Sequence, residues 1–190
     1  AGKIAKRLFT LSLRNETQQS YITLGDVSTR NVQKGSRFGY TDLTVVASDS
    51  YYYSFLVDRV NLGDQAFTTD HYAVADTGTS MLCFPPSIAN KFFQAEDFNE
   101  CSQADGLYIC DCDAILPPVE FMIAGRKFLI LSEDYLLPQD NRCLVGILNL
   151  TPPGDLIVLG DIFLRKAVVV FNLSDQTIGF APATREPIKA

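Results

Sequence analysis

Short apolar runs separated by Gly, Asp, Asn and Pro extend along this 190-residue chain from one end to the other. Runs of about 4 to 8 residues bounded by such turn residues are typical of β-strands. Because they follow one another with little helical periodicity between them, they predict an all-β sandwich or barrel rather than alternating β and α units. We expect strands at residues 8–13, 21–24, 43–46, 53–57, 119–123, 128–131, 156–159, 168–171 and 177–180.

One longer segment has the period of a helix instead. Pro85 and Pro86 suit the start of a helix, because the φ angle of proline is fixed near the helical value. Apolar residues then recur at helical spacing as far as Ala95, which predicts a helix over this stretch. Two shorter helical turns are expected at residues 132–135 and 161–165.

The composition excludes several classes of protein. With 47% hydrophobic residues the chain is too apolar to be disordered, and its length allows a core of its own. No linker-like composition divides it, so we expect a single domain over residues 1–190. A net charge of −6 disfavours nucleic acid as a partner, because phosphate binding needs clustered Lys and Arg. No apolar stretch approaches the ~18 residues that a membrane helix needs, so we expect no membrane segment in this chain.

Four of the five cysteines lie close enough in sequence to act together. Cys101, Cys110, Cys112 and Cys143 could form two disulfides or a zinc site. A structural zinc site usually takes two short Cys-x-x-Cys pairs, whereas the only close pair here is Cys-x-Cys, so disulfides are favoured and no metal is expected. Cys83 stands in an apolar run and is expected to be a buried small hydrophobic residue.

Three Asn-x-Ser/Thr triplets are potential acceptors for N-linked glycans. They begin at Asn15, Asn149 and Asn172. Such triplets often arise by chance, so each alone is a weak signal. Together with the expected disulfides they favour an oxidising compartment. We therefore predict a secreted or endolysosomal/vacuolar glycoprotein.

The most specific local feature is the loop Asp76-Thr77-Gly78-Thr79-Ser80, which directly follows an apolar strand. A carboxylate at the tip of a buried strand is costly unless hydrogen bonds satisfy it. Gly78 allows a sharp turn and offers an unobstructed N–H, while Thr77, Thr79 and Ser80 supply hydroxyl groups. An ordinary Asx-type turn is the alternative. The apolar residues that resume directly after the loop favour the buried setting.

A second feature lies about eighty residues later, where the apolar residues Ile157, Val158 and Leu159 lead into Gly160. With both features in this order, the chain resembles the C-terminal lobe of a pepsin-like aspartic endopeptidase, of the pepsin, cathepsin D and plasmepsin group. In that family an Asp-Thr-Gly loop is threaded against a hydrophobic-hydrophobic-Gly strand in a ψ-shaped motif. The resemblance covers nearly the whole chain. It implies a six-stranded-type closed β-barrel lobe with this ψ-loop and one or more short helices.

The resemblance also assigns roles within the loop. Asp76 corresponds to the second catalytic aspartate, and Thr77 to the residue that makes hydrogen bonds between the lobes. Gly78 corresponds to a donor of an N–H to the carboxylate, and Thr79 to a residue bonded to its outer oxygen. Gly78, Thr79 and Ser80 also line the position of the substrate backbone in relatives.

For the cysteines, the resemblance implies that Cys143 closes the disulfide of the C-terminal lobe. Cys110 is the better-aligned partner, Cys112 is a second possibility, and Cys101 then pairs with whichever is left. A short disulfide often found before the Asp-Thr-Gly loop is replaced here by Thr69, Asp70 and His71. This sole histidine has no cluster of ligands near it in sequence, so we expect a solvated loop residue rather than a metal ligand.

Catalysis of the family type needs two carboxyl groups. Held close together, they share one proton, because two adjacent negative charges would repel each other. The charged member then activates a water as general base and the protonated member polarises the scissile carbonyl, without a cofactor and best at acidic pH. This chain has a single Asp-Thr-Gly. The favoured interpretation is therefore one lobe, or one processed chain, of a bilobal aspartic endopeptidase that acts on peptides with an N-terminal lobe as its partner.

Two alternatives stay open. The chain could pair with a copy of itself, as retroviral enzymes do, although their subunits are much shorter. It could also be a non-catalytic relative that binds peptides or another protein, although its intact Asp76 loop gives that interpretation no support.

Overall fold

The computed structural model describes residues 4, 6–14, 19–44, 54–68, 71–150 and 155–184. The strands are β1 (Leu8–Ser12), β2 (Tyr21–Leu24), β3 (Gly39–Asp42), β4 (Ser54–Leu56), β5 (Arg59–Leu62), β6 (Gln65–Thr68), β7 (Tyr72–Ala75), β8 (Leu82–Phe84), β9 (Ser102–Ala104), β10 (Leu107–Cys110), β11 (Val119–Ile123), β12 (Arg126–Ile130), β13 (Leu136–Gln139), β14 (Arg142–Val145), β15 (Ile147–Asn149), β16 (Ile157–Leu159), β17 (Ala167–Asn172) and β18 (Thr177–Pro182). The helices are α1 (Pro86–Phe92), α2 (Ser132–Tyr135) and α3 (Asp161–Leu164), with a 3₁₀ turn η1 (Glu96–Phe98). The expected all-β class with short helices is confirmed.

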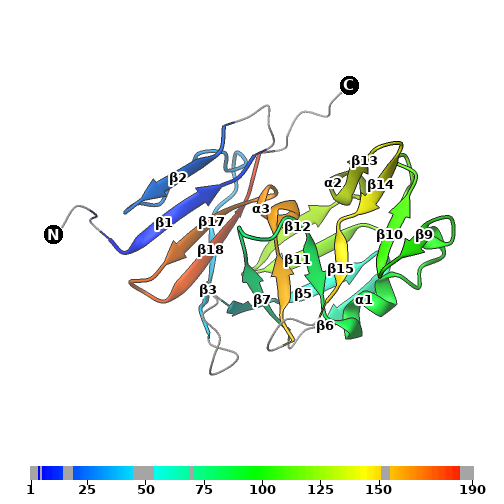
Figure 1. Ribbon diagram of the computed structural model, residues 1–190. Helices are drawn as coiled ribbons and strands as arrows, with labels where there is room; N and C mark the ends of the chain where they lie inside the picture. Colours follow the sequence, from blue (N-terminus) through cyan, green and yellow to red (C-terminus); the bar gives the residue numbers. More distant parts are fainter. Residues whose placement is uncertain are drawn as a thin grey trace.

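A five-stranded antiparallel sheet occupies one side of the molecule, in the order β2-β1-β17-β18-β3 (Figure 1). Its middle strand β17 is rich in β-branched residues and buried from Ala167 to Phe171, because a central strand is covered on both faces. Leu8 pairs with Asn172 and Ser12 with Val168, so strands from the two ends of the sequence lie side by side.

A second sheet, in the order β15-β8-β16-β7-β4, carries the Asp76 loop. Strand β16 pairs parallel with β7, where Ile157 faces Ala73, and antiparallel with β8, where Leu159 faces Leu82. It therefore lies between the two strands that flank the loop. This is the ψ-shaped threading that the resemblance implies.

The remaining described strands form two four-stranded sheets, β12-β11-β5-β6 and β13-β14-β10-β9. Four open sheets thus account for the strand pairing of the described residues, and the closed barrel is not seen among them. A cluster of aromatic rings joins the sheets at the centre of the core. The ring centroid of Phe163, on α3, lies 5.4 Å from Phe121, 5.3 Å from Phe128 and 6.1 Å from Phe180.

Most of the expected elements are present, with boundaries shifted by a few residues. The helix expected to reach Ala95 ends at Phe92, and both shorter helical turns are found. The strand expected at residues 43–46 is wrong for its described part, since Thr44 makes only an isolated bridge to Ser54, and residues 45–46 lie outside the described residues. Strand β3 forms just before it and pairs with β18.

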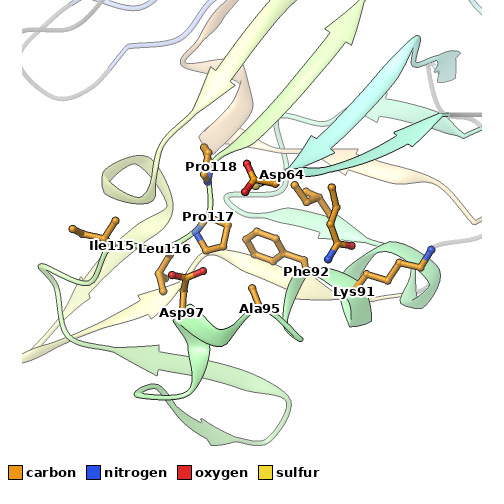
Figure 2. Close-up of a pocket in the computed structure, with 12 residues that line it drawn as sticks. Asp64, Lys91, Phe92, Ala95, Asp97, Ile115, Leu116, Pro117 and Pro118 are labelled. Carbon is orange, nitrogen blue, oxygen red and sulfur yellow. The ribbon is translucent and has the colours of Figure 1, made fainter.

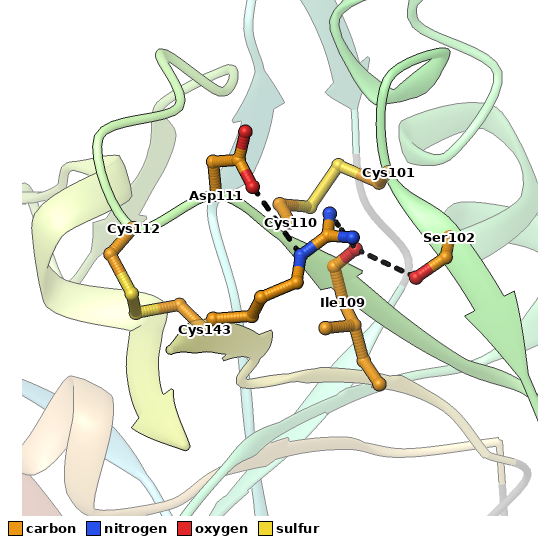
Figure 3. Close-up of polar contacts among 8 residues, drawn as sticks. Cys101, Ser102, Ile109, Cys110, Asp111, Cys112 and Cys143 are labelled. Atoms are coloured by element: carbon orange, nitrogen blue, oxygen red, sulfur yellow. Dashed lines mark hydrogen bonds and ion pairs between the residues drawn. A yellow bond between two sulfur atoms is a disulfide. The ribbon is translucent and has the colours of Figure 1, made fainter. Parts of the chain in front are cut away.

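The pairing of the cysteines differs from the preferred expectation. The disulfides are Cys101–Cys110 and Cys112–Cys143 (Figure 3), so the preferred Cys110–Cys143 bond is wrong and the Cys112 alternative is right. Cys110 does lie opposite Cys143 on β14. Its other neighbour is β9, where the hairpin register continues to Cys101, and the two Cα atoms are 4.4 Å apart. Cys83 is free and buried, as expected.

Candidate active site

The loop from Asp76 to Met81 connects β7 to β8 and is fastened to β16 and α3 by backbone hydrogen bonds. The Asp76 N–H donates to the carbonyl of Leu159 at 3.1 Å. The N–H groups of Asp161 and Ile162 donate to the carbonyls of Thr79 and Ser80, at 2.9 and 3.2 Å. The loop is therefore held by elements that lie about eighty residues away in the sequence.

Close approach between the loop and β16 depends on Gly160. A Cβ atom at this position would lie 2.2 Å from the carbonyl oxygen of Thr79 and 2.3 Å from that of Met81. Both contacts are with backbone, which has no room to move aside. Glycine is thus required where the hydrophobic-hydrophobic-Gly strand meets the loop.

The Asp76 carboxylate is held by two hydrogen bonds from its own loop. Oδ1 accepts from the backbone N–H of Gly78 at 2.8 Å, and Oδ2 accepts from the Thr79 hydroxyl at 2.7 Å. The side chain is partly buried, so these donors offset part of the cost of removing a carboxylate from water. They are the donors that the resemblance assigns, and the catalytic role of Asp76 stays a prediction.

The rim of the loop faces solvent. Thr77, Gly78 and Ser80 are exposed, whereas Thr79 is partly buried. Exposed backbone and hydroxyl groups beside a fixed carboxylate leave room for a polypeptide or a second domain to contact the loop. The expected roles of Thr77 and Ser80 in such contacts stay predictions.

Asp161 is a titratable residue beside this site that the sequence reasoning did not include. Burial raises the pKa of its carboxyl, the negative charge of Asp76 raises it further, and the nearby Arg165 lowers it. The signal that could have found it is its position directly after Gly160, because the residue after a glycine that touches the loop must itself lie close to the loop.

Cys83 and His71 are two other titratable residues near this loop in the sequence. Burial raises the pKa of the Cys83 thiol, and the charge of Asp76 raises it further, which keeps this thiol protonated and unreactive. The expectation that His71 is solvated is wrong, because its side chain is half-buried and its Nδ1 atom is buried without a hydrogen-bond partner in the described part of the chain. Its carbonyl accepts a hydrogen bond from the Val57 N–H, which holds the residue against the end of β4.

The described residues also bear on metal ligation and membrane insertion. Within them no group of three or more His, Cys, Asp and Glu side chains is placed to hold a metal ion. No helix in that part of the chain is long and apolar enough to cross a membrane.

Residues 1–183, which include the Asp76 loop and the strand threaded beside it, match the family of eukaryotic aspartyl proteases. The chain belongs to this family. The resemblance inferred from the Asp-Thr-Gly loop and the hydrophobic-hydrophobic-Gly strand is thereby confirmed.

Relatives of this eukaryotic aspartyl protease chain are considerably longer than the chain itself. Pepsin A of Gallus gallus is 30% identical over 186 residues, which cover 94% of this chain and 48% of the relative. Rhizopuspepsin-4 of Rhizopus niveus is 31% identical over 145 residues, covering 74% and 35%. A probable vacuolar protease A of Trichophyton verrucosum (strain HKI 0517) is 28% identical over 191 residues, covering 96% and 46%. The chain therefore spans about half the length, or less, of these relatives.

Proposed function

We propose that the chain is the C-terminal lobe of a bilobal aspartic endopeptidase and that Asp76 is one of its two catalytic aspartates. The observation that carries this proposal is the Asp76 carboxylate, fixed by Gly78 and Thr79 at the tip of a loop through which β16 is threaded. Membership of the aspartyl protease family supports the reaction class. The share of each relative that the chain covers supports its assignment to one half of the enzyme.

Peptide hydrolysis then proceeds between Asp76 and a second carboxyl supplied by an N-terminal lobe, in the same polypeptide or as a processed chain. The two carboxyls share a proton, so one activates water while the other polarises the scissile carbonyl. The hydrogen bonds from Gly78 and Thr79 hold the Asp76 carboxyl in place for this step. The substrate backbone lies along Gly78, Thr79 and Ser80, and Thr77 contacts the other lobe. The mechanism needs no cofactor and suits acidic pH.

The test is Asp76→Asn in the complete enzyme, assayed by cleavage of a peptide at acidic pH. Asn keeps the oxygen that accepts from Gly78, and its amide N–H can donate to the Thr79 hydroxyl in place of the bond that Asp76 accepts. We therefore expect cleavage to fall by about 10²–10⁴-fold while the melting temperature changes little. Asp42→Asn is a matched control, because the Asp42 side chain is exposed on β3 and makes no hydrogen bond or ion pair among the described residues. Full activity of the Asp76→Asn enzyme would contradict the proposal.

The same assay separates the alternatives. Cleavage that pepstatin blocks excludes a non-catalytic binding domain. A different result would be cleavage by the 190-residue chain alone, at a rate that rises with the square of its concentration. That result would indicate a homodimer in which each copy supplies its Asp76.

We further propose a secreted or endolysosomal/vacuolar location. Two disulfides support an oxidising compartment. One relative is named a vacuolar protease. Of the potential glycan acceptors, Asn149 is exposed at the end of β15, and its side-chain amide donates to Asn90 at 2.8 Å. The Asn172 side-chain oxygen accepts hydrogen bonds from two N–H groups of the turn that follows β17. Asn15 lies outside the described residues.

A further inference from the structure

A cavity separate from the Asp76 loop lies where α1, η1 and the turn between β5 and β6 meet. It has a volume of about 380 Å³, within the range of ligand-binding pockets. Its wall includes the buried Phe92 and Pro117 and the side chain of Ile115, which is 87% exposed. No residue of β7, of the Asp76 loop or of β8 contributes to it. An occupant would therefore bind apart from the proposed catalytic centre.

Two carboxylates lie on either side of this apolar floor. Figure 2 shows Asp64 on one side of Pro117 and Asp97 on the other, with the Phe92 ring next to Pro117. Both acidic residues are exposed, and neither makes a hydrogen bond or ion pair among the described residues. Lys91 also borders the cavity, but Figure 2 shows its amine directed away from Pro117. The floor is therefore apolar, and two carboxylates flank it, with Lys91 at its margin.

The segment that supplies most of this wall is acidic over its whole length. Residues 92–119 contain six Asp and Glu and no Lys or Arg. All six are exposed, and within the described part of the chain only Asp111 forms an ion pair, to Arg142 at 3.3 Å (Figure 3). The six are Glu96, Asp97, Glu100, Asp105, Asp111 and Asp113. Of the six, Asp97 borders the cavity, and a local excess of acidic residues attracts cationic partners.

We propose that this acidic cavity, defined by Asp64, Phe92, Asp97, Ile115 and Pro117, docks a basic polypeptide segment in which an apolar side chain lies between Lys or Arg residues. The apolar side chain packs on Phe92 and Pro117 and covers Ile115. Removing the exposed apolar surface of Ile115 from water favours binding. The flanking cations meet Asp64 and Asp97. A protein partner that carries such a segment satisfies this chemistry, and charge complementarity gives the docking its specificity.

Binding is measured by fluorescence anisotropy with a short labelled peptide, Lys-Lys-Leu-Lys-Lys, and with two variants of it, Glu replacing every Lys in one and Ser replacing Leu in the other. The protein carries Asp76→Asn, so that no peptide is cleaved and the result does not depend on the proposed catalysis. We expect the basic peptide with Leu to bind, the Ser peptide to bind several-fold more weakly, and the Glu peptide not to bind. Binding should also weaken as salt is added.

Two double substitutions then locate the site. Asp64→Asn with Asp97→Asn should weaken binding about tenfold at low salt. Asp42→Asn with Glu133→Gln removes the same number of negative charges from exposed residues outside the cavity and should leave binding within about twofold. Ile115→Ser should weaken binding without changing the charge. Circular dichroism checks that all variants remain folded.

Hydrogen exchange gives an independent readout. The bound peptide should slow amide exchange at residues 91–97 and at Ile115 and Leu116, and leave residues 76–81 unaffected. Equal weakening by the two double substitutions would overturn the proposal, because binding would then follow net charge rather than the cavity. Equal binding of the three peptides, or protection confined to residues 76–81, would overturn it as well.

Discussion

At the scale of single residues, two carboxyl groups, those of Asp76 and Asp161, lie close together at the loop. The Asp76 carboxylate has two fixed donors, Gly78 and Thr79, while Asp161 is held nearby with its pKa raised. Asp76 accepts two hydrogen bonds from its own loop, whereas burial and the charge of Asp76 oppose the ionisation of Asp161.

This difference predicts a pH-dependent stability that can be measured on the variant Asp161→Asn. The folded-state pKa of Asp161 is above its ordinary value of 3.8, so the folded state holds the proton more tightly than the unfolded state. The stability that protonated Asp161 contributes is fully present below pH 3.8, and it is lost as the pH rises through the raised pKa of the folded state. Asp161→Asn should therefore raise the melting temperature more at about pH 7 than at about pH 3. The gain should be small, because the side chain is only partly buried.

Asp42→Asn is the control for this measurement, since it removes an exposed carboxylate that lies outside the site. Its effect on the melting temperature should be similar at the two pH values. A larger stabilisation by Asp161→Asn at acidic pH than at neutral pH would contradict the assignment.

At the scale of elements, the β9–β10 hairpin decides the pairing of the cysteines. Its two-residue turn is Asp105-Gly106, and both residues have positive φ angles, 50° and 78°. Such a turn fixes the register of the strands that it joins. Counting outward from the turn, Cys101 comes opposite Cys110, which leaves Cys112 for Cys143. The Asp-Gly pair was visible in the sequence and would have given this pairing.

The two disulfides should stabilise the protein to different degrees. The bond between Cys112 and Cys143 closes a sequence separation of 31 residues, and that between Cys101 and Cys110 closes 9. In the chain-entropy model these loops correspond to about 3.5 and about 2.5 kcal/mol. Replacing both cysteines of a pair by alanine should therefore cost more for the longer loop, as measured by denaturant unfolding. Peptide mapping without reduction checks the pairing, and a fragment that links Cys110 to Cys143 would contradict it.

At the scale of the whole molecule, the aromatic core holds separate sheets together. Phe163 on α3 contacts Phe121 and Phe128 from one sheet and Phe180 from another. Phe55, from the sheet that carries the Asp76 loop, lies 4.8 Å from Phe180. The same helix also donates backbone hydrogen bonds to that loop. The core therefore couples the position of the loop to the packing of the sheets.

Phe163→Ala should consequently lower the free energy of unfolding by about 3–5 kcal/mol, because it leaves a large cavity among fully buried rings. Phe163→Leu keeps most of the volume and is the matched control, with a clearly smaller loss. Denaturant unfolding measures both. Equal stability of the alanine variant and the unsubstituted protein would show that the cluster does not hold the sheets together.

Sequence patterns were reliable wherever the decisive interactions are local. The runs at residues 8–13 and 119–123 became β1 and β11, and the proline pair starts α1. The strand β3 was missed because Gly39-Tyr40-Thr41-Asp42 contains no apolar run. It forms because β18 offers it hydrogen-bonding groups. The carbonyl of Ala124 also approaches so closely that only a glycine fits at position 39.

The sequence by itself determined the β class, through the spacing of its apolar runs and turns, and the Asp76 loop, through residues that are adjacent in the chain. Only the tertiary structure decided that Asp161 lies beside Asp76 and that Asp64, Asp97 and Ile115 border one cavity. The physical reason is distance along the chain. Contacts within a few residues follow from local geometry, whereas these groups meet only after the sheets have packed around a common core.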